Sequence, residues 1–293
     1  MSTIIDQKVT DRFAMYHGDC VDVMKGLKEN SVHFEVYSPP FAQLYTYSNS
    51  PRDMGNVRSY EEFFDHFAFA LEQLYRVLQP GRLMAMHCML IPTSKAKDGY
   101  IGLRDFRGDL IKAAERRGFI LHGETCIWKD PVTQMQRTKA LGLLHKTVRE
   151  NASMSRPGLA DYLVAMRKPG DVEERVKHDA ADYPVEKWQR VASPVWMDID
   201  PSDTLQYQSA REHDDERHIC PLQLGVIRRA IELWTNPGDL VLSPFAGIGS
   251  EGYVAVQEGR RFIGAELKAS YYRQAAANLE RAVMHAQSGL FGA

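Results

Sequence analysis

A chain of 293 residues can form one large α/β domain or two smaller ones, each with an ample core. Its composition, 44% hydrophobic and 25% charged, is ordinary for a globular protein, and its formal net charge of -2 argues against a wholly basic nucleic-acid coat protein. An enzyme that acts on nucleic acid is not excluded, because only the surface that faces phosphates must be basic.

The N-terminal part alternates predicted strands with predicted helices. Strands are expected at residues 13–17, 32–37, 83–90 and 119–128, and helices at 21–27, 60–78 and 105–117. Ser59 is the expected N-cap of the second helix, and Glu62 completes a capping box. Strands that alternate with helices of this length predict a mostly parallel sheet covered by helices on both faces, which is the α/β class.

A short proline-containing motif, Ser38-Pro39-Pro40-Phe41, follows the strand expected at 32–37. Consecutive prolines restrict the backbone, so the Ser38 hydroxyl and the Pro39 carbonyl oxygen are two rigid hydrogen-bond acceptors. A plain strand-ending turn is the alternative interpretation of these four residues. The tetrapeptide alone therefore does not decide between a structural and a catalytic role.

The middle of the chain differs in charge. Residues 131–157 carry a single acid, Glu150, and five basic residues, which are Arg137, Lys139, Lys146, Arg149 and Arg156. They are candidates for binding DNA phosphates or base edges, with a solvated helix face as the alternative. A strand is expected at 161–167. Residues 171–217, which we call the acidic segment, would repel phosphates, so we expect a subunit contact or a loop remote from nucleic acid there.

A glycine-rich turn lies in the C-terminal part, where a helix is expected at 221–234, strands at 239–243 and 261–266, and a last helix at 271–285. Gly247, Gly249 and Gly252 follow the first strand, and the acidic Glu266 ends the second. This is the context of a nucleotide-binding loop, in which the acid accepts hydrogen bonds from ribose. A nicotinamide-dinucleotide enzyme is disfavoured, because the few residues after Glu266 cannot complete the sheet downstream of the turn.

The order of these motifs, tetrapeptide first and glycine turn last, resembles the β class of S-adenosylmethionine-dependent DNA amino-methyltransferases. Residues 16–20, 217–222 and 264–266 are similar to further blocks of that family, so the resemblance covers nearly the whole chain. It implies a Rossmann-like methyltransferase fold with circularly permuted motif order. Residues 1–130 then hold the tetrapeptide part of the catalytic domain, and residues 218–293 hold its cofactor-binding part. Residues 131–217 add the last strand or strands, the inserted target-recognition region and a subunit contact.

The resemblance also assigns roles to individual residues. Ser38, Pro39, Pro40 and Phe41 are the expected catalytic residues, with Phe41 stacked on a base rotated out of the duplex. The expected cofactor-binding residues are Asp19, His218, Pro221, Ser243, Phe245, Gly247, Gly249 and Glu266, and no metal is expected. For Asp19, capping of the helix at 21–27 is an equal alternative. The chain departs from the family pattern at Ser243, where the family has an Asp that holds the ammonium group of the cofactor, and at Ile248.

The predicted function is methyl transfer from S-adenosylmethionine to the exocyclic amino group of a base in double-stranded DNA, by a homodimer. Ser at position 38 is typical of cytosine-N4 enzymes, whereas likeness to solitary, phage-type enzymes favours adenine N6, which we expect by a small margin. Methylation of RNA or of a protein glutamine, and a catalytically silent DNA-binding module, are the alternatives.

The location is expected to be cytoplasmic. The four cysteines are widely spaced without a CxxC pair, which is typical of reduced thiols. The first residues lack an apolar signal segment, and no apolar run reaches the ~18 residues of a membrane span. We therefore expect no membrane partner.

Overall fold

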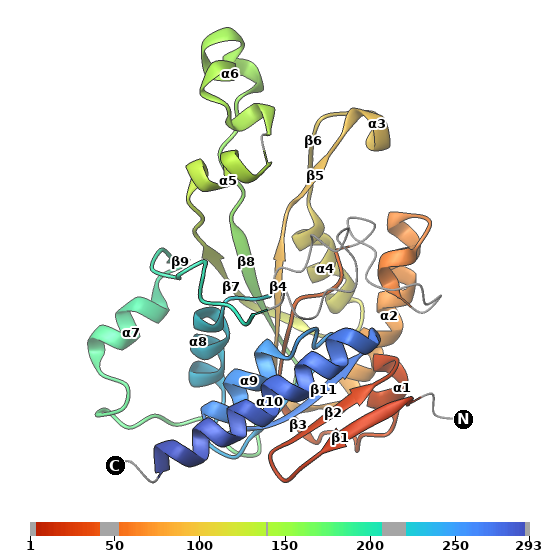
Figure 1. Cartoon of the computed structure of the whole chain (residues 1–293), viewed down its shortest axis with the longest axis vertical. Helices are drawn as coiled ribbons and strands as arrows, with labels where there is room; N and C mark the ends of the chain where they lie inside the picture. The colour runs from red at the N-terminus through yellow and green to blue at the C-terminus, as the bar shows by residue number, and fades with distance from the viewer. Residues whose placement is uncertain (1–3, 42–52, 139, 207–220, 291–293) are drawn as a thin grey trace.

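A nine-stranded sheet forms the centre of the protein in the computed structural model, which describes residues 4–41, 53–138, 140–206 and 221–290 (Figure 1). The strand order is β1-β2-β11-β10-β3-β4-β8-β7-β9. The strands are β1 (Asp6–Val9), β2 (Phe13–His17), β3 (Val32–Tyr37), β4 (Leu78–Met89), β7 (Ile120–Ile127), β8 (Asp161–Arg167), β9 (Val195–Trp196), β10 (Leu240–Ser243) and β11 (Arg261–Glu266). The five strands from β2 to β4 in this order are parallel, whereas β8 is antiparallel to both of its neighbours.

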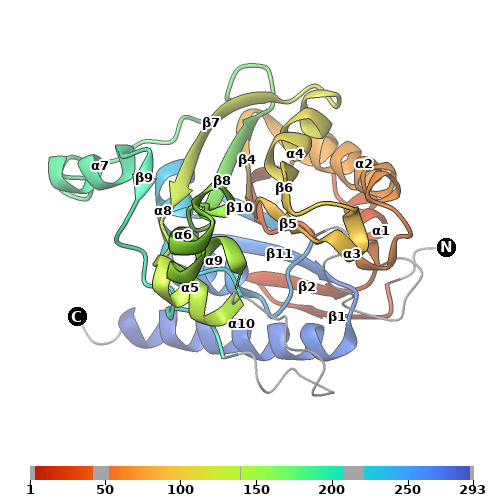
Figure 2. The ribbon, with the colours of Figure 1, turned by 90° about the horizontal axis from the view of Figure 1, so that it is seen from above.

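Helices cover both faces of the sheet, as the alternating sequence pattern predicts (Figure 2). Helices α1 (Cys20–Lys25), α2 (Tyr60–Val77) and α4 (Phe106–Glu115) pack into one hydrophobic core, and α8 (Leu224–Trp234), α9 (Ser250–Gln257) and α10 (Ala269–Leu290) into the other. Along β3, Phe34 and Val36 enter the second core and Tyr37 the first, which is the period-two alternation of a strand. The expected α/β class with a mostly parallel sheet is confirmed.

Several element bounds differ from the sequence expectation, and the one between α2 and β4 has a clear physical cause. Helix α2 ends at Val77 and β4 begins at once at Leu78, because Leu78 already pairs with Val32 of β3. The register then shifts before Phe34 pairs with Leu83, and this irregularity accommodates Pro80 and Gly81 within the strand. Gly81 has a φ of 75°, and a Cβ at this position would lie 2.7 Å from the backbone nitrogen of Val172, so only glycine fits there.

Two projections rise from the edge of the sheet toward which β4 and β7 run (Figure 1). We call residues 131–154 the arm; it contains α5 (Pro131–Thr138), the short 3-10 turns η2 (Leu141–Leu143) and η3 (Ala152–Met154), and α6 (His145–Glu150). We call residues 91–104 the hairpin; it contains β5 (Ile91–Thr93), α3 (Lys95–Asp98) and β6 (Gly102–Arg104). Strands β4 and β7 point the same way, because both are antiparallel to β8, and the hairpin follows β4 as the arm follows β7.

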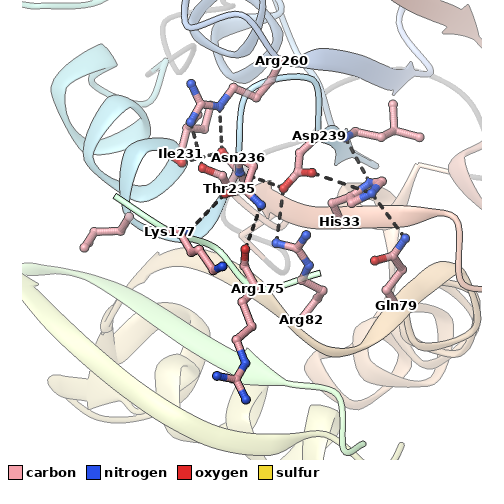
Figure 3. Close-up of polar contacts among 12 residues, drawn as sticks. His33, Gln79, Arg82, Arg175, Lys177, Ile231, Thr235, Asn236, Asp239 and Arg260 are labelled. Carbon is pink, nitrogen blue, oxygen red and sulfur yellow. Dashed lines mark hydrogen bonds and ion pairs between the residues drawn. The ribbon is translucent and has the colours of Figure 1, made fainter. Parts of the chain in front are cut away.

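A polar cluster lies at the opposite edge, where the parallel strands begin (Figure 3). The buried Arg82 guanidinium is 3.2 Å from the Asp239 carboxylate, and Leu240 N–H donates to His33 Nδ1 at 3.1 Å. The Asn236 side chain accepts from the backbone N–H of Lys177 and donates to the Arg175 carbonyl oxygen. The cluster therefore ties the start of the acidic segment, which continues through α7 (Val185–Ala192), to this edge.

None of the helices in the described residues combines the length and apolar character that a membrane crossing requires.

Candidate active site

One cavity of about 980 Å³ brings together the motifs that are far apart in the sequence. It lies at the carboxyl ends of the parallel strands, which is where α/β sheets bind ligands. Asp19 follows β2, Ser38 follows β3, the glycine turn follows β10, and Glu266 ends β11. The predicted site residues that line the cavity are Asp19, Ser38, Pro39, Pro40, Phe41, Arg156, Pro221, Phe245, Gly247 and Glu266.

Glu266 is held rigidly beside the glycine turn. Its carboxylate accepts hydrogen bonds from the backbone N–H of Gly247 at 2.9 Å and from that of Lys268 at 2.8 Å. Burial raises the pKa of Glu266 to about 7, although these two N–H groups oppose the shift. Gly249 is the N-cap of α9 with a φ of 84°, and a Cβ there would lie 3.2 Å from Ala275, so the turn packs against α10 without a side chain.

Asp19 serves as a helix cap and also lies at the cavity. Its Oδ1 accepts hydrogen bonds from the backbone N–H groups of Val21 and Asp22, at the start of α1. The capping interpretation is therefore correct for this oxygen, and it is compatible with a ligand contact from the same residue.

The remaining predicted cofactor residues have different positions. Phe245 lies at the cavity, with its ring 5.7 Å from that of Tyr37. Ser243, the last residue of β10, is fully buried, and among the described residues its hydroxyl has no hydrogen-bond partner. His218 lies outside the described residues.

Ser38 is the first member of a hydrogen-bonded chain that the sequence did not reveal. Ser38 Oγ lies 3.0 Å from His87 Nδ1, and His87 Nε2 lies 3.0 Å from Asp161 Oδ2. Lys129 Nζ, from the turn after β7, is 2.5 Å from the same Asp161 oxygen. Burial opposes ionisation of Asp161, but the adjacent His87 and Lys129 outweigh it and lower the pKa of this carboxyl.

The direction of the hydrogen bonds follows from the chemistry of the partners. An ionised Asp161 only accepts, so His87 Nε2 carries a proton, and in the neutral imidazole Nδ1 is then an acceptor. The Ser38 hydroxyl then donates to Nδ1, and its remaining lone pairs are available to accept hydrogen bonds from a group in the cavity. His87 and Asp161 were detectable as polar residues beside the apolar runs 83–86 and 163–166, since buried polar groups are normally paired.

Phe41 and the arm contribute further parts of the cavity. The Phe41 ring is 6.0 Å from the Phe106 ring. Arg156, just after the arm, lines the cavity together with Thr138 of α5 and Pro92 of the hairpin, so the cavity reaches both projections. Lys146 and Arg149 are exposed on α6, and Lys146 lies 3.5 Å from Glu150.

Arg137 and Lys139 are the two remaining candidates for DNA binding, and the structure adds little about their role. Arg137 lies in α5, and Lys139 lies outside the described residues. Within the acidic segment, Ile199, Pro201 and Thr204 line the cavity wall.

Known proteins resemble this chain both in family pattern and in overall sequence. A DNA methylase family (N6_N4_Mtase) matches residues 32–277. The type II methyltransferase M.Cfr9I of Citrobacter freundii is 40% identical over 285 residues, covering 88% of this chain and 84% of that protein. The DNA adenine methyltransferase YhdJ of Escherichia coli K12 is 25% identical over 274 residues, covering 90% of this chain and 81% of that protein.

Two further matches have different coverage. The type II methyltransferase M.BglII of Bacillus subtilis is 25% identical over 259 residues, which are 88% of this chain but 66% of that protein. The fold matches that of TTHA0409 from Thermus thermophilus, solved in complex with S-adenosyl-L-methionine, with a TM-score of 0.69 and 22% identity over 94% of this chain and 95% of the other.

Proposed function

Because the chain belongs to the DNA methylase family of S-adenosylmethionine-dependent N6-adenine and N4-cytosine methyltransferases, we propose that it methylates the exocyclic amino group of a base rotated out of duplex DNA. The observation that carries this proposal is one cavity with two chemically different ends. The glycine turn and Glu266 form one end, and Ser38 with its hydrogen-bonded chain forms the other.

The first end fits the nucleoside part of the cofactor. A buried carboxyl group beside a glycine turn is suited to accept hydrogen bonds from ribose hydroxyls, and Glu266 occupies that position. Asp19 and Pro221 line the same cavity and are proposed to contact the adenosine group. When bound, S-adenosylmethionine supplies a methyl group already activated by its sulfonium centre.

The second end fits the methyl acceptor. An exocyclic amine is a poor nucleophile, because its lone pair is delocalised into the base ring. Ser38 Oγ and the Pro39 carbonyl oxygen are proposed to accept its two N–H hydrogens, which orients the nitrogen lone pair toward the methyl group. Phe41 is proposed to stack on the rotated base.

The hydrogen-bonded side chains of Ser38, His87 and Asp161 give the surplus proton a route away from the amine. The nitrogen gains a methyl group and must lose one proton. We propose that Ser38 Oγ takes this proton while the Ser38 hydroxyl proton moves to His87 Nδ1. Asp161, hydrogen-bonded to the other ring nitrogen, stabilises the imidazolium that forms.

The two projections are proposed to hold the duplex between them. The cavity extends to both the arm and the hairpin, so a base that enters it comes from DNA lying against both. Arg156 at the cavity and the exposed Lys146 and Arg149 on α6 can neutralise phosphates. A second copy of the chain is the proposed subunit partner, and the free thiols of Cys20, Cys88 and Cys126 fit the proposed cytoplasmic location.

Adenine N6 is the first candidate for the methylated position. YhdJ, which matches over 90% of this chain, is named as a DNA adenine methyltransferase. Cytosine N4 is the second candidate, favoured by the serine at position 38, where the hydrogen-bond acceptor is uncharged. Both amines present two hydrogens to the same pair of acceptors.

The direct test is to express the protein in a host without DNA methylation and to analyse the host DNA as nucleosides by mass spectrometry. N6-methyladenine supports the first candidate and N4-methylcytosine the second. A Ser38→Ala variant is the control and should leave the DNA unmethylated while still binding the cofactor. Unmodified DNA in cells that contain folded wild-type protein would contradict the proposal.

A further inference from the structure

A second buried carboxyl group, that of Glu251, lines the cofactor end of the cavity. Glu251 is in the first turn of α9, only 4% of its surface is exposed, and it shares the cavity wall with Ile248, Ser250 and Glu266. The turn of α9 that carries it is packed tightly, since a Cβ on the next residue, Gly252, would lie 2.4 Å from the Phe262 ring. The position of Glu251 in the wall is therefore fixed by the fold.

In the part of the chain that the structure describes, the groups that act on the Glu251 carboxyl include no cation. Burial, with a smaller contribution from the repulsion by Glu266, raises the pKa of Glu251 to about 8, although its own backbone N–H opposes the shift. Among the described residues, the charged group that acts on it is thus another carboxyl group. A buried carboxylate of this kind is costly unless a cation lies beside it, and a cationic ligand group in the cavity would supply that charge.

The acid expected at the end of β10 is missing. The family pattern has Asp at this position, but Ser243 carries no charge, is fully buried, and does not line the cavity. The glycine turn, residues 244–249, connects β10 directly to α9, so Ser243 and Glu251 lie at the two ends of one short loop. A carboxylate on the first turn of α9, at the other end of that loop, can therefore supply a negative charge to the same cavity.

We propose that Glu251 binds the α-ammonium group of the methionine part of S-adenosylmethionine, in place of the acid that is absent at Ser243. The inference rests on the proposed cofactor site and deepens it. Glu266 then contacts the ribose and Glu251 contacts the amino-acid part, so each of the two buried acids binds a different part of the cofactor. An ammonium–carboxylate pair of this kind is a charge-assisted hydrogen bond, shorter and stronger than a neutral one.

The test uses cofactor analogues that contain or lack the ammonium group, titrated calorimetrically into the full chain. S-adenosylhomocysteine contains ribose, carboxylate and ammonium, its deaminated analogue lacks only the ammonium, and 5′-methylthioadenosine lacks the whole amino-acid part. For Glu251→Gln we expect S-adenosylhomocysteine to bind about 10- to 100-fold more weakly than to the wild type, the size of a charged hydrogen bond. The affinities of the two other compounds should stay within about twofold.

A Glu266→Gln variant is the matched control. It should weaken all three compounds, because all contain ribose. Retained binding of 5′-methylthioadenosine by Glu251→Gln also shows that this variant is folded. The inference is overturned if Glu251→Gln leaves S-adenosylhomocysteine unaffected, or if it weakens 5′-methylthioadenosine equally. A wild-type protein that binds none of the three compounds would instead contradict the proposed cofactor site.

Discussion

At the scale of single residues, the catalytic end of the cavity depends on how Ser38 is hydrogen-bonded. A serine hydroxyl alone is a weak proton acceptor, and the Ser38–His87–Asp161 chain offers it a base and an anion behind the base. The proposal therefore assigns proton removal to a neutral imidazole rather than to a carboxylate in direct contact with the substrate.

Replacement of His87 by Asn tests this assignment. Asn can hydrogen-bond to Ser38 but cannot take a proton, so we expect kcat to fall by about 10²- to 10⁴-fold, the usual contribution of a general base. The affinity for S-adenosylhomocysteine should remain within about twofold, measured by calorimetry. His122→Asn, an exposed histidine on β7, is the control and should keep wild-type kcat. An unchanged kcat in His87→Asn would show that His87 and Asp161 only position Ser38 and do not take up its proton.

At the scale of elements, the sequence predicted the strands more reliably than the projections. The bounds expected for β2, β3, β8 and β11 are the observed ones, because short apolar runs delimited by turn residues identify buried strands. The arm and the hairpin have no comparable signal, since neither contributes a long apolar face to a core. The local helices of the arm therefore appeared only in the structure.

The same contrast, between features with a local sequence signal and features without one, explains which residues at the cavity were predictable. Asp19, Ser38 and Glu266 were predictable because each follows or ends a recognisable strand, and parallel strands bring their carboxyl ends together. His87 and Asp161 meet only through the antiparallel pairing of β4 with β8, in which His87 pairs with Leu163 and Asp161 lies two residues away on the same face. That register is set by long-range contacts, which a local pattern does not contain.

The arm should contribute DNA affinity without contributing chemistry. We expect the double variant Lys146→Ala/Arg149→Ala to bind duplex DNA about 10-fold more weakly, and the salt dependence of log Kd to become shallower by about one unit for each phosphate that is no longer neutralised. Fluorescence anisotropy over a series of salt concentrations measures both effects. Lys112→Ala, an exposed lysine on α4, should change neither. Wild-type affinity in the double variant would place the duplex elsewhere.

The polar cluster at the other edge makes the stability of the fold sensitive to acid. Burial, only partly offset by Asp239, lowers the pKa of His33, whose Nδ1 accepts a hydrogen bond from Leu240 N–H. The unfolded chain therefore takes up this proton near pH 6.5, whereas the folded chain does so only at lower pH. The contribution of neutral His33 to the free energy of unfolding is complete above that pH and is lost as the pH falls below it.

Thermal unfolding at about pH 8 and about pH 5.5, on either side of the ordinary histidine pKa, checks this dependence. We expect Tm of the wild type to fall more between the two pH values than Tm of His33→Gln, whose amide does not titrate. His122→Gln, which changes an exposed histidine, should behave like the wild type. An equal fall in His33→Gln and the wild type would exclude His33 as the source of the acid sensitivity.

At the scale of the whole molecule, the acidic segment contributes to the cavity wall and also carries the proposed subunit contact. Near its start, Arg175 and Lys177 are hydrogen-bonded to Asn236 at the edge opposite the cavity (Figure 3). Farther along, Ile199, Pro201 and Thr204 line the cavity wall. Between these points α7 stands away from the sheet (Figure 1). Its Val185 and Trp188 side chains are 63% and 57% exposed, which is unusual for an apolar pair on one short helix and marks α7 as the proposed contact with a second copy of the chain.

Trp188→Glu should therefore convert a dimer into a monomer, because it places a charge in the apolar centre of that contact. Sedimentation velocity over a range of protein concentrations measures the change, with the wild type expected at the mass of two chains. Phe69→Glu is the control, since Phe69 is 60% exposed on α2, far along the chain from α7, and its replacement should leave the dimer intact. Dissociation by Phe69→Glu alone would move the subunit contact to α2, and a monomeric wild type would exclude the dimer. Both variants should keep wild-type affinity for S-adenosylhomocysteine, because neither residue lines the cavity.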